Sequence, residues 1–62
     1  MSWSIEKGIA NDLRELSALM VSVANKMDCV EDRDYKMHAD ELKGAANYIQ
    51  EWSNEIVKEL KN

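Results

Sequence analysis

The sequence predicts an all-α protein: an antiparallel two-helix hairpin, of the helical coiled-coil kind, that dimerises into a four-helix bundle. Two apolar patterns with alternating spacings of three and four residues run along the chain, which is typical of helices that pack on other helices. The 62 residues include no proline and only two glycines, so few residues oppose helix formation. A single small domain, residues 1–62, is expected at this length.

The first helix is expected at about residues 3–27. Ser2 or Ser4 can cap its N-terminus, because a serine side-chain oxygen accepts a hydrogen bond from a free backbone N–H there. Its apolar positions form an unbroken heptad repeat. These residues are Ile9, Leu13, Leu16, Met20, Val23, Met27 and Val30.

The second helix is expected at about residues 35–60, and its apolar pattern is out of phase with the first by one residue. Continuing the first pattern would bury Asp34, Glu41 and Gly44. A chain that doubles back at a tip, residues 28–34, avoids this, with Asp32 or Asp34 as the N-cap of the second helix. A single long helix with one skipped residue is the alternative. The second pattern consists of Tyr35, His38, Leu42, Ala45, Ile49, Trp52 and Ile56.

We expect the two patterns to face each other inside the hairpin, with Leu16 opposite Ala45 and Ile9 opposite Trp52. Beside them runs a stripe of small residues that makes the apolar face wider than a two-helix contact requires. We predict that this stripe is an open groove in which a second hairpin, or another protein's helix, docks. Gly44 lies near it and suggests a close backbone approach. The stripe consists of Ala10, Ser17, Ala24, Ala39, Ala46 and Ser53.

Charge is concentrated at the predicted tip. The chain carries 12 acidic and 8 basic residues, a net charge of −4, which is the wrong sign for gripping nucleic-acid phosphates. Most of the excess lies between Asp28 and Asp34, where it either caps and solvates the turn or recognises a basic partner. The candidate partner-binding residues are three acids of the tip and two aromatic residues outside the apolar face. They are Glu31, Asp32, Asp34, Trp3 and Tyr48.

No pattern in the sequence predicts a catalytic, cofactor-binding or metal-binding site. His38 is the only histidine and has no second histidine or cysteine at ligand spacing. Cys29 is the only cysteine, and the neighbouring acids disfavour its reactive thiolate form. The longest apolar run, Ala18 to Val21, is too short to cross a membrane. With its free thiol and no basic leader segment, the protein is expected to be soluble and cytoplasmic.

Two short segments resemble known families. The segment from Ala39 to Ala46 resembles the phosphoacceptor segment of histidine phosphotransfer domains, with Asp40 at the position of the phosphorylated histidine. This resemblance implies a silent module that docks on a receiver domain. The segment from His38 to Leu42 resembles a pentapeptide of Rop, a plasmid RNA-binding protein that is a dimer of helical hairpins. That resemblance implies a hairpin dimer that binds RNA.

The sequence therefore favours a small non-enzymatic protein–protein interaction module that acts as a regulator, adaptor or inhibitor, in the form of a homodimer. The first alternative is a phage or mobile-element inhibitor, or a small subunit, whose hairpin completes its core on a larger partner protein. The second is a Rop-like RNA-binding hairpin dimer. No cofactor and no membrane partner are expected.

Overall fold

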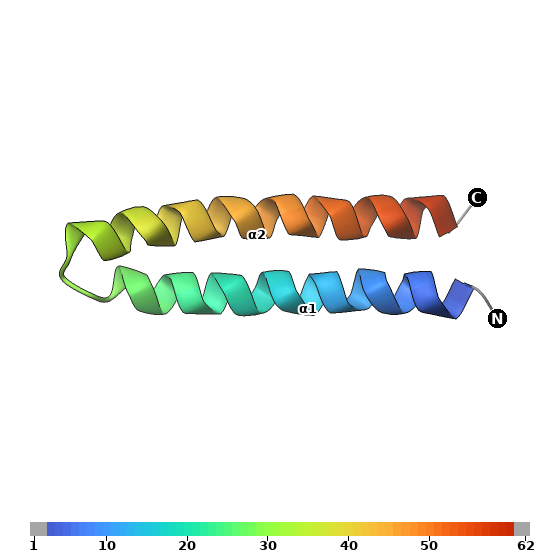
Figure 1. The fold of residues 1–62 in the computed structure, drawn as a ribbon, viewed down its shortest axis with the longest axis horizontal. Coiled ribbons are helices and arrows are strands. Elements are labelled where there is room, and N and C mark those ends of the chain that lie inside the picture. The colour runs from blue at the N-terminus through green and yellow to red at the C-terminus, as the bar shows by residue number, and fades with distance from the viewer. Residues whose placement is uncertain (1–2, 61–62) are drawn as a thin grey trace.

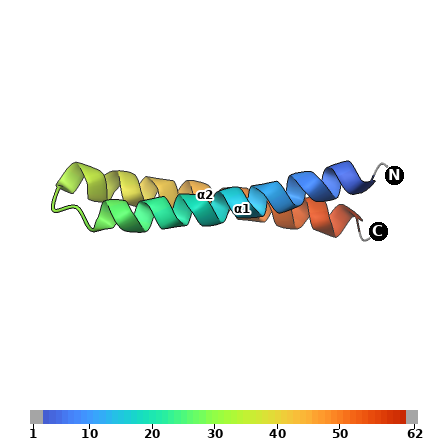
Figure 2. The ribbon, with the colours of Figure 1, turned by 90° about the horizontal axis from the view of Figure 1, so that it is seen from below.

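The protein is a hairpin of two long helices. The computed structural model describes the backbone of residues 3–60 and the side chains of residues 5–60. Helix α1 spans Trp3–Asp28 and α2 spans Arg33–Leu60. The helices run antiparallel and bring the two ends of the chain to the same end of the molecule (Figure 1). Seen from the side, they wind around each other (Figure 2). The all-α hairpin is thus confirmed, and the single long helix is excluded.

The tip is shorter than the sequence predicts, because α1 ends one residue later and α2 begins two residues earlier. Asp32 is the N-cap of α2: its Oδ1 accepts a hydrogen bond from the Asp34 N–H at 2.8 Å, and its carbonyl accepts one from the Lys36 N–H at 3.1 Å. At the end of α1, the Cys29 N–H donates to the Lys26 carbonyl at 3.1 Å. Among the described residues the turn needs no positive φ angle, which explains why it contains no glycine.

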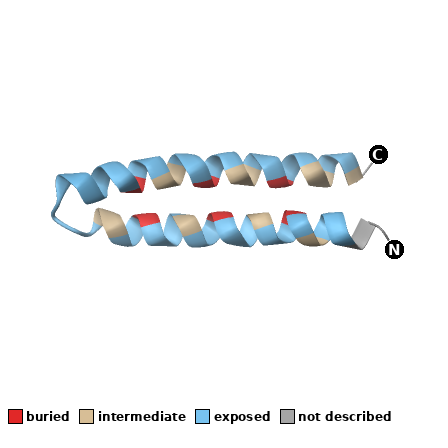
Figure 3. Ribbon diagram, viewed as in Figure 1, coloured by how far each residue is buried: buried red, intermediate tan, exposed pale blue. Residues whose placement is uncertain are grey.

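The small-residue stripe lies between the two helices and is buried (Figure 3). The Ser53 hydroxyl donates a hydrogen bond of 2.7 Å to the Ala10 carbonyl of the other helix. A hydroxyl lies only one bond beyond Cβ, so this contact requires the two backbones to approach closely. Moving seven residues towards the tip along each helix brings Ser17 level with Ala46, and Ala24 level with Ala39. All six residues of the stripe are buried: Ala10, Ser17, Ala24, Ala39, Ala46 and Ser53.

The prediction that this stripe is an open docking groove is therefore wrong, because the hairpin closes on it. The predicted pairing of Leu16 with Ala45 and of Ile9 with Trp52 as the buried core is also wrong, since all four residues are exposed. An apolar face three rows wide cannot be covered by one neighbouring helix. The row of small residues lies between the helices because it permits the closest approach. The larger residues are displaced to one side.

Gly44 does not mark the close approach between the helices. A Cβ atom added there would meet no other atom within 4 Å, and the residue is exposed. The buried residues of the stripe, Ala46 and Ser53 among them, make the close approach instead.

Candidate functional site

One long side of the hairpin carries most of its large apolar residues, and we call it the large-residue face. In each helix, two rows of residues that recur every seven positions lie on the same side of the small-residue stripe. The row next to the stripe is half-buried at Leu13, Met20 and Met27 of α1 and at Leu42, Ile49 and Ile56 of α2. The row beyond it is exposed. Its members include Ile9, Leu16 and Val23 of α1, with His38, Ala45 and Trp52 of α2, and Val30 of the turn continues the row beyond α1.

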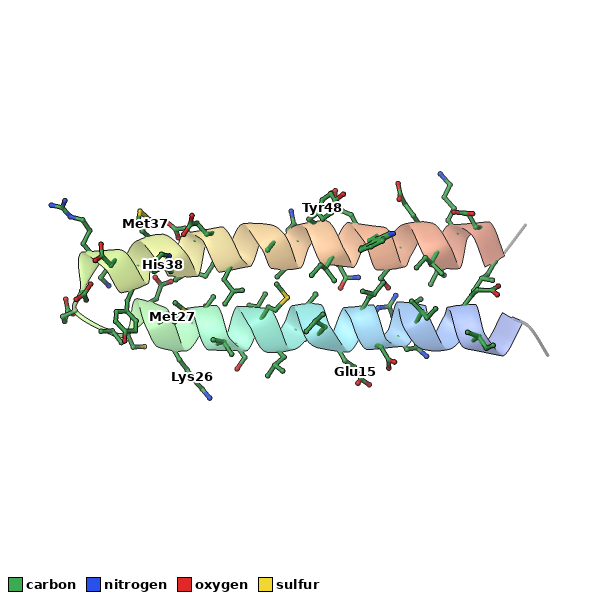
Figure 4. All side chains as sticks on the ribbon, in the orientation of Figure 1. Glu15, Lys26, Met27, Met37, His38 and Tyr48 are labelled. Atoms are coloured by element: carbon green, nitrogen blue, oxygen red, sulfur yellow. The ribbon has the colours of Figure 1, made fainter. Side chains whose placement is uncertain are left out.

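The outer row of this face consists largely of apolar side chains, yet these side chains are about half exposed to solvent. Ile9 is 48% exposed, Leu16 44%, Val23 41% and Trp52 55%. Contiguous apolar surfaces of this kind, bordered by polar residues, mark interaction sites. Figure 4 shows the polar border: Glu15 and Lys26 extend outward from α1, while His38 and Met27 lie nearer the middle of the hairpin.

The opposite long side of the hairpin, which we call the polar side, is closed by polar contacts between the helices, and Val21 is also exposed there. Ser17 Oγ lies 3.3 Å from Gln50 Oε1, and Gln50 Nε2 donates to Asn54 Oδ1 at 3.1 Å. Lys43 Nζ donates to Asp28 Oδ2 at 2.6 Å. A shallow depression on this side is lined by Ser17, Lys43 and Gln50, among others. These polar groups already satisfy one another, so the polar side offers less to a partner than the large-residue face.

The Asp28–Lys43 ion pair joins the end of α1 to α2. The hydrogen bond from Lys43 lowers the pKa of the Asp28 carboxyl, and the same bond raises the pKa of the Lys43 ammonium. Lys36 Nζ also donates to the Asp28 carbonyl at 2.8 Å, which satisfies a free carbonyl at the helix end. The two lysines therefore offset part of the negative charge that the sequence concentrates at the tip.

The predicted partner-binding residues do not form one site. Glu31, Asp32 and Asp34 are exposed at the tip, where Asp32 is used as the N-cap. Tyr48 is 71% exposed and extends outward from α2, away from the tip (Figure 4). The side chain of Trp3 lies outside the described residues.

Tyr48 has a neighbour that sequence analysis assigned to the core. Tyr48 and Trp52 line a shallow surface depression together with Glu51 and Glu55. Trp52 thus belongs to the exposed outer row of the large-residue face, and Tyr48 borders that face. Two aromatic rings beside two carboxylates could receive a basic side chain.

Groups suited to catalysis or metal binding are dispersed over the described residues. His38 Nδ1 lies 2.8 Å from Glu41 Oε1, and both side chains are more than half exposed. Cys29 is a free and exposed thiol. Within residues 5–60, no three histidine, cysteine, aspartate or glutamate side chains gather as a metal site would require. In the described part of the chain, neither helix is apolar enough over sufficient length to cross a membrane.

The large-residue face was not identified from the sequence, although a signal for it was present. Alanine or serine recurs every seven residues in both helices, at Ala10, Ser17 and Ala24 and again at Ala39, Ala46 and Ser53. A strict repeat of small residues favours the closest helix contact, and the larger rows beside it must then face elsewhere.

Comparison of the chain with protein-family models, with curated proteins and with solved structures finds no match.

Proposed function

We propose that the protein is a small non-enzymatic interaction module, a regulator, adaptor or inhibitor, that works as a homodimer joined through its large-residue face. The observation that carries this proposal is the composition of the interior. Among the described residues, every fully buried side chain is an alanine or a serine. Such side chains bury little apolar area, so the hairpin gains little hydrophobic stabilisation alone. Covering the large-residue face would supply the missing burial.

The accessible surface of the chain supports a partner interface of standard size. The hairpin exposes 4900 Å². A compact monomer of 7.1 kDa exposes about 4100 Å². The excess of about 800 Å² equals the area that each partner contributes to a standard protein–protein interface.

A second copy of the chain is the simplest partner. The Cα trace extends 48 × 14 × 10 Å, so the face is long and narrow, and an identical face can match it along its whole length. Stacking two such hairpins gives a four-helix bundle. The half-buried rows, which include Leu13, Met20, Leu42 and Ile49, would become its core.

The dimer would leave the tip and the outer edges free for a further protein. Glu31 at the tip, and Tyr48 on the outer edge of α2, favour a basic partner segment. We place the protein in the cytoplasm, since a free exposed thiol such as Cys29 suits a reducing compartment.

The test is the mass in solution of the wild-type protein and of two matched variants. We expect light scattering to give twice the chain mass for the wild type. Leu16→Asp introduces charge into the large-residue face and should yield a monomer. Ala18→Asp inserts the same side chain into the same helix, at an exposed position on the polar side, and should remain a dimer.

A wild-type protein that is folded and monomeric at all concentrations would show that the homodimer is wrong. The alternative to test is then a larger protein that covers the face. A pull-down from the native cell with wild type and Leu16→Asp would then identify a partner that only the wild type retains.

A further inference from the structure

We infer that the two copies of the homodimer pack with their tips at the same end, so that α1 of each chain lies against α2 of the other. This inference rests on the proposed homodimer and adds the relative orientation of its two chains. Two symmetric arrangements can bring the large-residue faces together: one with both tips at one end, and one with the tips at opposite ends. The two arrangements place different residues opposite each other.

The contact between Ser53 and Ala10 shows which residues of α1 and α2 lie side by side, at the same level along the long axis of the hairpin. A two-fold axis parallel to the hairpin preserves these levels in the same-end arrangement. Leu16 would then lie near Ala45 of the partner subunit, and Val23 near His38 of the partner subunit. A large residue would thus meet a small one in the middle of the interface, which favours close packing. The helices also overlap along their whole length.

Charge complementarity favours the same arrangement. Lys26 lies beside the outer apolar row of α1, between Val23 and Val30, and extends outward (Figure 4). In the same-end dimer its level falls between those of two acids, Asp34 and Glu41 of the partner subunit. This contact occurs twice because of the symmetry. A less favourable pair, Asp12 with Glu55 of the partner subunit, also forms twice, near the open ends.

The opposite-end arrangement gives Lys26 fewer acidic neighbours in the partner subunit. It places α2 against α2 of the partner, and every charged residue flanking the outer row of α2 is acidic: Asp34, Glu41 and Glu55. Lys26 could reach only Asp12 of the partner subunit. That contact requires the hairpins to slide by about one and a half helical turns, which leaves the open ends of both hairpins uncovered.

Cys29 provides a direct test, because it is the only cysteine, lies at the tip and is exposed. A spin label on Cys29 allows the distance between the two tips to be measured by pulsed electron paramagnetic resonance. Tips at the same end should lie about 20 Å apart, given normal spacing between helix axes. Tips at opposite ends are separated by about 20 to 25 residues of helical rise, or about 30 to 40 Å.

Charge reversal gives an independent test with a matched comparison. Lys26→Glu should weaken the dimer about three- to tenfold. Adding Glu41→Lys should strengthen the dimer more in the Lys26→Glu background than in the wild type if the tips share one end, because the two charges then meet across the interface. Asp12→Lys should show such coupling to Lys26→Glu only in the opposite-end arrangement, since in the same-end dimer it acts on Glu55 of the partner subunit equally in both backgrounds. Lys58→Glu, on an exposed part of α2 away from the large-residue face, should change the dissociation constant less than twofold.

The outcomes separate this inference from the proposed function. A short distance between labels, together with coupling between Lys26→Glu and Glu41→Lys, supports the same-end dimer. A distance above 30 Å, or coupling of Lys26→Glu to Asp12→Lys rather than to Glu41→Lys, overturns the orientation while the homodimer stands. A monomeric mass with no dipolar signal between labels overturns the homodimer and, with it, the orientation. Dilution with unlabelled protein must reduce the signal if the distance is measured between chains.

Discussion

Asp28 illustrates how one residue at the end of a helix connects two elements. Its carboxylate accepts a hydrogen bond of 2.6 Å from Lys43, and its carbonyl accepts one of 2.8 Å from Lys36. Both partners belong to α2, so the end of α1 is held against the other helix by two contacts. The sequence suggested only an acidic cluster here, because the pairing depends on a distance that the turn creates.

The Asp28–Lys43 pair should make stability depend on pH at both extremes. The pKa of Asp28 is lowered in the folded chain, so its contribution is present above the ordinary value of 3.8 and is lost as the pH falls through the folded pKa. The pKa of Lys43 is raised, so its contribution is complete below 10.5 and is lost as the pH rises through the folded pKa. Urea unfolding of Asp28→Asn at several pH values measures both effects.

We expect Asp28→Asn to be less stable than the wild type at pH 7, with a difference that shrinks below pH 3.8 and above pH 10.5. Glu15→Gln is a suitable control, because Glu15 extends outward from α1 (Figure 4). A deficit of Asp28→Asn that stayed constant from pH 2.5 to pH 7 would contradict the role of the ion pair.

At the scale of the helices, the seven-residue repeat of small residues decides which faces meet. Ser53 shows this most directly, since its hydroxyl reaches the backbone of α1 at Ala10 and is itself fully buried. A larger residue at these positions would separate the helices and break such contacts. The alanines of the stripe therefore act through their size rather than through their hydrophobicity.

We predict that Ala24→Leu destabilises the protein by about 1 to 3 kcal/mol, because added methylene groups cannot be accommodated between closely packed helices. Ala24 is fully buried. Ala18→Leu adds the same side chain to the same helix at an exposed position, and should change stability by about 0.5 kcal/mol or less. Chemical unfolding monitored by circular dichroism compares the two variants. Equal effects of both substitutions would show that the stripe is not the closest contact.

The two helices were largely predictable from the sequence, whereas the faces through which they pack on each other were not. The spacing of apolar residues predicted both helices to within two residues of their ends, and Asp32 was one of two predicted N-caps. These features depend on local hydrogen bonds and on periodicity. The contact between the helices depends on a competition among three neighbouring rows. Residue sizes on both helices decide that competition together, so Leu16 and Trp52 were misassigned to the interior of the hairpin.

At the scale of the whole molecule, the proposed dimer couples folding to association. The single hairpin buries little more than its small-residue stripe, and the half-buried rows remain partly in contact with water. A protein stabilised by a second copy must become more stable as its concentration rises.

We therefore expect the melting temperature to increase with protein concentration, by about 5 °C for each tenfold rise. Thermal unfolding followed by circular dichroism over a hundredfold range of concentration measures this. The Leu16→Asp variant, which should be monomeric, should show a melting temperature independent of concentration. A wild-type melting temperature that does not change with concentration would contradict coupled folding and association.

Two helices with a turn between them could be inferred from the amino-acid sequence, because helix propensity, capping and apolar periodicity are local properties. The same holds for the excess of negative charge at the tip. That the small residues close the hairpin, and that the large residues remain on one exposed face, emerges from the packing of the two helices. The cause is steric, since antiparallel helices pack where their backbones approach most closely. That choice becomes visible only when both surfaces are brought together.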